Sequence, residues 1–224
     1  DNFYVYAGRT QQLPCTVRQK VFGDFNRSEA DKVASGINSE FSEIFWFYPS
    51  ASSSENDKYV IYNYGEKVWY FGSLARTAWL DRGTRANPLA AGNQYIFNHE
   101  IGFDDDGSAM TSFIESAAID IGDGDKFTYI RRVIPDLTFL GSTNLSSPQA
   151  VFTVKSRRFP GASFDNTDAG TAIGSISGEV ETFTEQLHLR SRGRSFAVRV
   201  ESTALGTKWK LGSPRVDLRA DGRQ

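Results

Sequence analysis

Short runs of aromatic and β-branched residues recur in the first part of the chain, and each run stops at Gly, Asn, Asp, Ser or Pro. Three of them follow closely: Glu43 to Tyr48 reads EIFWFY, Lys58 to Tyr64 reads KYVIYNY, and Lys67 to Phe71 reads KVWYF. Such runs are typical of β-strands. Because the connections between them are short, antiparallel pairing is favoured. The pattern therefore predicts an aromatic antiparallel meander.

Longer segments in which apolar and polar residues alternate occupy the chain from about Met110 onward. In one of them Phe196, Val198 and Val200 alternate with small or charged residues, which gives the strand one apolar face and one polar face. Six segments are predicted as half-buried strands on this pattern: Ser112 to Ile121, Lys126 to Ile134, Gln149 to Arg157, Gly178 to Arg192, Arg194 to Thr203 and Lys208 to Arg219. Long two-sided strands favour a sandwich-like arrangement.

One segment, Ser28 to Ile37, has a helical signature, because Ser28 can cap it and Gly36 stands near its end. A single short helix leaves the predicted class all-β. We place a domain boundary in the stretch 84–94, which contains Pro88 and Gly92, and so expect domains at residues 1–90 and 91–224. The chain opens directly with a strand-like run, so we expect it to be a fragment of a longer polypeptide.

The composition excludes several classes of protein. With 224 residues, 39% of them hydrophobic, and a net charge of -2, the chain can bury a proper core and is not a disordered segment. No apolar run approaches the roughly 20 residues that span a bilayer, so no membrane partner is expected. One cysteine, Cys15, and two histidines, His99 and His188, exclude a structural zinc site built from several thiolates. No cofactor is predicted.

Signatures of catalysis are weak. The sequence has no Gly-x-Ser-x-Gly elbow, no phosphate-binding Gly-Lys-Ser/Thr loop and no dinucleotide-binding glycine motif. Cys15 is far in sequence from either histidine, and His99 is favoured as a hydrogen-bonded structural group over an acid–base role beside Glu100. A glycosidase needs two distinct carboxyl groups, and no acid stands out from its neighbours. We therefore predict a protein that is not an enzyme.

Acidic residues crowd the stretch 100–125, which holds no Lys or Arg. Calcium takes six to eight oxygen ligands, so the Asp-Gly runs DDDG and DIGDGD offer weak calcium candidates. Neither run has the spacing of a helical calcium loop, and hairpin turns built from Asp and Gly are the favoured interpretation. The candidate ligands are Asp104, Asp106, Asp120, Asp123 and Asp125.

Positive charge gathers at the other end of the sequence. Arginines cluster around Gly193, where a strand end or hairpin tip would present several guanidinium groups together. A contact with carboxylates of another subunit is favoured over nucleic-acid binding, because the net charge is negative and no nucleic-acid motif is present. The subunit-contact candidates are Arg190, Arg192, Arg194, Arg199, Arg215 and Arg219. An acidic middle and a basic end would suit head-to-tail packing in a ring.

A succession of segments resembles the C-terminal part of phage tail nozzle proteins, the group that includes tail tubular and packaged-DNA stabilisation proteins of short-tailed phages. The order of the segments carries the resemblance, and the closing Arg-x-Asp-x-Arg-x-Asp-Gly-Arg pattern is its most specific part. The segments are DFN at 24–26, EFSEIFWFYPS at 40–50, DKYVIYNY at 57–64, RTAWLD at 76–81, HEIG at 99–102, DIGDGD at 120–125, RRFPG at 157–161 and LGSPRVDLRADGR at 211–223.

The resemblance implies a structural virion protein of the phage tail. Copies, six in that family, would close a ring below the portal and adaptor, contact other tail proteins, hold packaged DNA and let it pass at ejection with only non-specific contact. It also implies that the meander is a blade-like portion of a β-propeller beside a β-sandwich-like region. The alternative is a carbohydrate-binding tail module that recognises host glycans, with Trp and Tyr side chains as platforms; the tryptophans are Trp46, Trp69, Trp79 and Trp209.

Overall fold

The computed structural model describes residues 1–122, 124–144, 149–166, 171–172 and 174–222 of the 224-residue chain. It is mostly β, with 47% strand and 6% helix in several antiparallel sheets, and no closed propeller is detected. The all-β antiparallel prediction is thus confirmed at that level. The chain divides into two compact units, Asp1–Ile101 and Gly102–Gln224. The predicted boundary after residue 90 therefore falls too early, inside a strand of the first unit. In the described residues no helix is both long and apolar enough to cross a bilayer.

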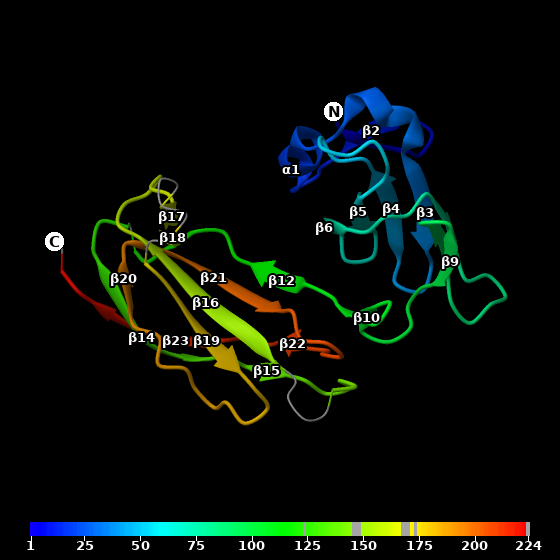
Figure 1. Ribbon diagram of the computed structural model, residues 1–224. Helices are drawn as coiled ribbons and strands as arrows, with labels where there is room; N and C mark the ends of the chain where they lie inside the picture. The colour runs from blue at the N-terminus through cyan, green and yellow to red at the C-terminus, as the bar shows by residue number, and fades with distance from the viewer. Residues whose placement is uncertain (123, 145–148, 167–170, 173, 223–224) are drawn as a thin grey trace. The chain divides into compact units, whose positions relative to one another are not determined.

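The first unit is built on a four-stranded antiparallel sheet in chain order (Figure 1). Its strands are β3 (Ala34–Asn38), β4 (Glu43–Tyr48), β5 (Lys58–Asn63) and β6 (Val68–Ser73). The last three match the predicted meander. Around the sheet lie a hairpin of β1 (Phe3–Tyr6) and β2 (Thr10–Leu13), helix α1 (Arg18–Gly23), a 3-10 helix (Arg27–Lys32), and a second sheet of β7 (Ala78–Leu80), β8 (Leu89–Gly92) and β9 (Tyr95–Asn98).

Both faces of the four-stranded sheet are covered by apolar side chains. On one face Phe45, Phe47 and Ile61 are buried and Trp79 of β7 stacks on Phe45 with ring centroids 4.8 Å apart. The other face buries a second cluster, which consists of Val21, Tyr48, Val60 and Trp69 with Phe3 packed against it. Burial on both faces explains why β4 and β5 read as nearly continuous apolar runs rather than as clean alternation.

The predicted helix over residues 28–37 is wrong. Only its first residues are helical, in the 3-10 helix that Asn26 caps by accepting a hydrogen bond from the Ser28 amide at 3.1 Å. The rest of the segment forms strand β3, in which Gly36 lies directly beneath the ring of Trp79. The packing of the Trp79 ring against the strand thus overrides a weak local helical preference.

The second unit has two sheets that share one hydrophobic core. The larger sheet has the strand order β12–β21–β16–β19, with β13 also paired to β21, and the smaller has the order β20–β14–β23. Val133 of the smaller sheet and Phe152, Val154 and Val200 of the larger are fully buried in the same cluster. These strands are β12 (Ser112–Glu115), β13 (Ile119–Asp120), β14 (Thr128–Ile134), β16 (Ala150–Arg157), β19 (Ser175–Val180), β20 (Ser191–Gly193), β21 (Ser195–Ser202) and β23 (Arg215–Ala220).

Three two-stranded pairs complete this unit. They are β10 (Asp104–Asp105) with β11 (Ser108–Ala109), β15 (Leu137–Thr138) with β22 (Lys210–Leu211), and β17 (Asp165–Asn166) with β18 (Thr171–Ala172). The predicted strand over residues 178–192 is wrong, because the chain leaves the larger sheet after Val180 and joins the smaller one at Ser191. Between them Leu187 and Leu189 pack into the shared core, so apolar residues alternate there without forming a continuous strand.

Two more predicted strands are interrupted. Residues 112–121 divide into β12 and β13, where the Ser116 hydroxyl accepts a hydrogen bond from the Val198 amide at 3.0 Å in place of a backbone partner. Residues 208–219 divide into β22 and β23 at Gly212, Ser213 and Pro214. The alternating pattern alone would predict one continuous strand in each segment. A side-chain hydrogen bond interrupts the first and a proline interrupts the second.

Candidate subunit-contact site

The outer surface of the smaller sheet brings predicted contact arginines together. Tyr129 of β14 lies opposite Arg192 of β20 on one side and Arg219 of β23 on the other. Directly opposed residues in a sheet point to the same face, and successive residues point to opposite faces. Because the next residue, Ile130, is buried in the core, the row Arg192–Tyr129–Arg219 faces away from the core.

Aromatic stacking and an ion pair hold two of these guanidinium groups. The Cζ atoms of Arg192 and Arg194 lie 4.2 Å and 4.6 Å from the centroid of the Phe127 ring. The Nε of Arg192 also donates to the Asp221 carboxylate, which follows β23. Cation–π contact and ion pairing both restrict the guanidinium planes, so these side chains are presented in a defined position.

The same face continues toward the other end of β14. Arg132 and Arg215 line a shallow open hollow together with Ile134, Val216 and Asp217. One Arg132 Nη atom lies 4.0 Å from the Asp217 carboxylate, a partly exposed pair. Exposed pairs of this kind contribute little to stability, so the positive potential of the surface is the more important property.

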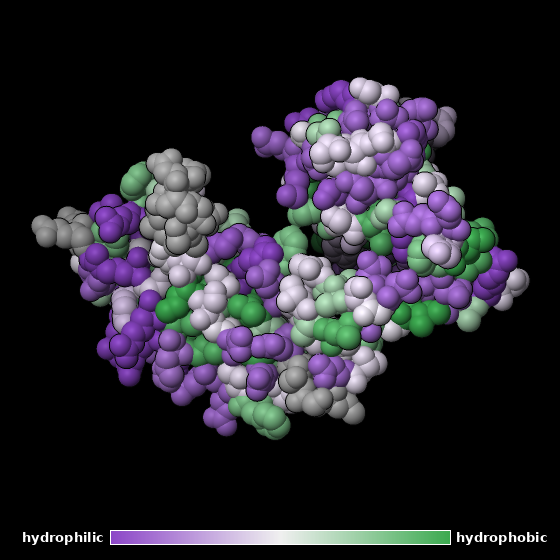
Figure 2. All heavy atoms as spheres, in the orientation of Figure 1, coloured by the Kyte–Doolittle hydropathy of each residue, from purple (hydrophilic) through white to green (hydrophobic). Residues whose placement is uncertain are grey.

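We call this surface the basic face. Among the residues that the structure describes, it includes the guanidinium groups of Arg132, Arg192, Arg194, Arg215 and Arg219 and the carboxylates of Asp217 and Asp221. Arg190 is exposed in the segment just before β20. Figure 2 shows hydrophilic side chains gathered over this part of the second unit. The sequence-predicted candidates Arg192, Arg194, Arg215 and Arg219 thus share one surface, and the sequence analysis did not single out Arg132.

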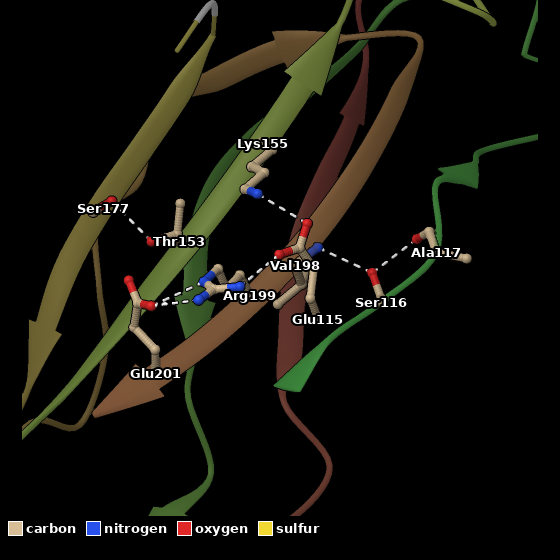
Figure 3. Close-up of polar contacts among 9 residues, drawn as sticks. All are labelled: Glu115, Ser116, Ala117, Thr153, Lys155, Ser177, Val198, Arg199 and Glu201. Atoms are coloured by element: carbon tan, nitrogen blue, oxygen red, sulfur yellow. Dashed lines mark hydrogen bonds and ion pairs between the residues drawn. The ribbon is translucent and has the colours of Figure 1, made fainter. Parts of the chain in front are cut away.

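Arg199 lies apart from that surface, so its inclusion in one arginine cluster is wrong. It points from the outer face of the larger sheet and bonds Glu115 at 2.9 Å and Glu201 at 2.7 Å (Figure 3). Lys155 reaches the other oxygen of Glu115 at 2.8 Å, and the Arg199 Cζ atom lies 4.0 Å from the centroid of the Phe113 ring. Three strands are joined by these contacts, which indicates a structural role.

The charges of this network balance one another. Burial raises the pKa of Glu115, but the hydrogen bonds from Lys155 and Arg199 outweigh it, so the pKa lies below its ordinary value. For Arg199 burial lowers the pKa, and the bonds to Glu201 and Glu115 raise it above the ordinary value. A carboxylate and a guanidinium that satisfy each other within the unit leave little charge to attract a partner.

The acidic stretch does not assemble a metal site from the predicted ligands. Asp104 accepts a hydrogen bond from the Gly206 amide at 2.7 Å, while Asp106 and Gly107 have positive φ in the turn of the β10–β11 hairpin. Within the described ranges, no three side chains among His, Cys, Asp and Glu gather so as to hold a metal ion. The calcium interpretation of Asp104, Asp106, Asp120 and Asp125 therefore has no geometric support, and Asp123 lies outside the described residues.

A carboxyl pair that the sequence analysis did not identify lies in the first unit. Glu43 of β4 stands opposite Asn38 of β3 and Asn63 of β5, on the same face as the Phe45 cluster. Asn38 is 0% exposed, and its Nδ2 donates to Glu100 Oε1 at 3.0 Å. Glu100 adopts φ +60°, a conformation uncommon for a non-glycine residue. We call Glu43, Glu100 and Asn38 the carboxyl cluster.

Both acids of the carboxyl cluster are harder to ionise than free glutamate. Burial, followed by the nearby charge of Glu100, raises the pKa of Glu43 to about 7. Burial also raises the pKa of Glu100, against the opposing effect of the hydrogen bond from Asn38, and the charge of Glu40 adds to the rise. Nearby carboxyl groups disfavour simultaneous ionisation.

Other residues considered for chemistry are engaged in packing. His99 Nε2 accepts a hydrogen bond from Arg76 Nε at 2.9 Å, and its ring centroid lies 4.9 Å from that of Trp79. Burial raises the pKa of the Cys15 thiol, which makes it a poor nucleophile at neutral pH. The four tryptophans pack against the cores rather than stand exposed as platforms: Trp46, Trp69, Trp79 and Trp209.

Comparisons with known proteins identify no relative. No protein-family model matches the sequence, and no curated protein matches it significantly.

Proposed function

We propose that this chain is a structural subunit of a phage tail nozzle or head–tail connector. In this proposal copies of the chain assemble into a ring, six by the resemblance, that holds packaged DNA in the virion tail and lets it pass at ejection. The flanking partners would be the portal, the adaptor and other tail proteins. The ordered segments that resemble tail nozzle proteins supply the family, and the surfaces of the second unit supply the physical support.

The basic face is the observation that carries the proposal. Assembly requires a surface whose charge complements another surface, and it needs no reactive groups. Among the described residues of this face the guanidinium groups outnumber the carboxylates placed beside them, and the Phe127 ring orients two of the guanidinium groups. The exposed acids Asp105 and Asp106, at the tip of the β10–β11 hairpin, offer a patch of the opposite sign on the same chain. A neighbouring copy can therefore supply the counter-charge.

The proposal includes a blade-like meander in the first unit and a sandwich-like second unit. The four-stranded antiparallel meander β3–β6 has the strand order of one propeller blade, and the two sheets around one core in the second unit are sandwich-like. A closed propeller is built from several such blades. On this view the chain is a part of a longer polypeptide or a reduced relative of the family.

The alternative, a carbohydrate-binding tail module, has less support. Sugar platforms are exposed aromatic rings, and the four tryptophans that suggested this function pack into or against cores. Among the described residues, the most exposed aromatic side chains are instead Tyr6, Tyr95 and Phe183, which come from three separate segments of the chain.

Light scattering coupled to size-exclusion chromatography tests the proposal, with a glycan array run on the same preparation. A ring-sized oligomer at low salt without glycan binding supports the proposed function. A monomer or trimer that binds sugars favours the carbohydrate-binding alternative. A monomer that neither assembles at high concentration nor binds glycans contradicts both.

A further inference from the structure

The carboxyl cluster contains a buried oxygen that has no hydrogen-bond donor. Asn38 is completely buried on β3, and its Oδ1 has no partner, while its Nδ2 donates to Glu100 Oε1. A carboxylate can only accept hydrogen bonds, so the bond to Glu100 fixes which end of the amide is nitrogen. An unpaired buried acceptor destabilises the folded state. The carbonyl end of Asn38 therefore lacks a positive partner in a part of the unit that is already negative.

The strand register places the Asn38 side chain beside one of the two carboxyl groups, and a hydrogen bond joins it to the other. Asn38 and Glu43 are directly opposed on β3 and β4, so their side chains leave the same sheet face side by side. The Asn38 amide reaches Glu100 through the nitrogen bonded to the same carbon as Oδ1. Glu43, in turn, experiences the charge of Glu100. The strand register and the hydrogen bond thus link three oxygen-bearing side chains from β3, β4 and the segment after β9.

We propose that the carboxyl cluster is a calcium site in which Glu43, Glu100 and the Oδ1 of Asn38 are ligands. All three donors are oxygens, the donor type that Ca²⁺ prefers, and nothing in the set offers the nitrogen or sulfur that favours transition metals. Because Glu43 is only partly buried and Glu100 is exposed, water can complete the coordination shell. A cation there would pair with the orphan oxygen and remove the repulsion between the two carboxylates.

Glu40 and Asn63, which lie near the carboxyl cluster, are engaged with other partners. Glu40, which adds to the negative potential at Glu100, is paired with Arg82 at 3.0 Å. Asn63, on the opposite side of Glu43, already donates to the Phe41 carbonyl at 2.9 Å and accepts from the Glu66 amide at 2.8 Å. In the described residues no lysine or arginine is paired with Glu43 or Glu100. The inference does not depend on ring assembly.

Thermal unfolding of the full chain tests the site. Protein stripped with EDTA is measured at pH 8 with and without 5 mM CaCl₂, at matched ionic strength. We expect Ca²⁺ to raise the Tm of the transition that includes the first unit by about 5 °C or more. Tb³⁺ luminescence excited through the aromatic residues reports binding directly and separates it from effects on folding.

Two variants and one control decide the outcome. Glu43→Gln and Glu100→Gln keep the side-chain shape and remove one charge each, so both are expected to lose the Ca²⁺ shift and to bind Tb³⁺ at least about ten-fold more weakly. Glu66→Gln removes an exposed charge from a residue that is no ligand, and it should retain both effects. No Ca²⁺ shift in the parent chain, or an equal shift in Glu43→Gln, would overturn the proposal.

Discussion

Gly36 shows at the residue scale how a single side chain decides the local structure. A Cβ atom at this position would lie about 2.4 Å from the Trp79 ring, which is closer than any real contact. The tryptophan ring in turn stacks on Phe45 and donates its Nε1 hydrogen to the Ile37 carbonyl at 2.9 Å. The absence of a side chain therefore allows β7 to cover β3.

We predict that Gly36→Ala destabilises the first unit by about 1–3 kcal/mol, because the added methyl group forces the ring out of its stack. Gly23→Ala is the matched control, since nothing lies within 4 Å of a Cβ there and its φ is not positive. Urea unfolding followed by tryptophan fluorescence measures both. Equal midpoints for the two variants would show that the Trp79 contact does not determine the stability of the unit.

The carboxyl cluster predicts a pH effect. Because folding raises the Glu43 pKa from 4.5 to about 7, the folded state holds the proton more tightly than the unfolded state does. This stabilisation is complete below about pH 4.5 and is lost as the pH rises through 7. The full linkage effect is about 3 kcal/mol, and solvent screening at a half-buried carboxyl reduces it to about 1–2 kcal/mol.

Denaturant unfolding in EDTA at pH 4.5 and pH 8 checks this effect. Relative to the parent chain, Glu43→Gln should gain about 1–2 kcal/mol at pH 8 and nothing at pH 4.5, because glutamine mimics the protonated acid. A difference between the two proteins that stays constant across this range would contradict the assignment.

At the element scale, the two sheets of the second unit depend on a few fully buried side chains. Phe152 of β16 is 0% exposed in the shared core, whereas Phe183, in the segment between β19 and β20, is 89% exposed. Phe152→Ala is expected to cost about 3–5 kcal/mol, and Phe183→Ala less than about 0.5 kcal/mol. Calorimetry of the two variants checks the contrast. Similar losses would mean that the sheets do not share the core as described.

Strands were predictable where burial alone sets the pattern. The run EIFWFY matches β4 residue for residue, because both faces of that strand are covered. The segment 181–190 was not predictable, since Leu187 and Leu189 alternate like strand residues while the chain is crossing between sheets. Residues 28–37 have a helical pattern locally, and their first part is a 3-10 helix. The contact that favours a strand in the second part joins Gly36 to Trp79, which is distant in sequence.

The sequence predicts the basic face better than the carboxyl cluster, because the arginines are clustered in sequence and the members of the carboxyl cluster are not. Arginines clustered in sequence suggested the contact set, and the strand register then joined Arg219 to Arg192 and separated Arg199. The carboxyl cluster depends on Asn38 and Glu100, which are 62 positions apart. No local motif marks such a pair, so only the folded structure could bring it out.

At the scale of the whole molecule, the basic face predicts assembly that depends on charge and salt. Arg215→Glu combined with Arg219→Glu reverses two exposed charges on β23 and should shift the oligomer toward monomer, as should raising the salt concentration. Arg85→Glu, at an exposed position in the first unit, is the control that should leave assembly unchanged. Light scattering measures all three. Unchanged assembly in the double variant would remove the basic face from the interface.

Electron microscopy of the assembled particle tests the central claim most directly, with the chain located in the reconstruction. The account predicts a closed ring of copies around the DNA path, in which the outer surface of β20, β14 and β23 meets a neighbouring copy. A single copy standing alone in the particle, with that surface turned to solvent, would contradict it.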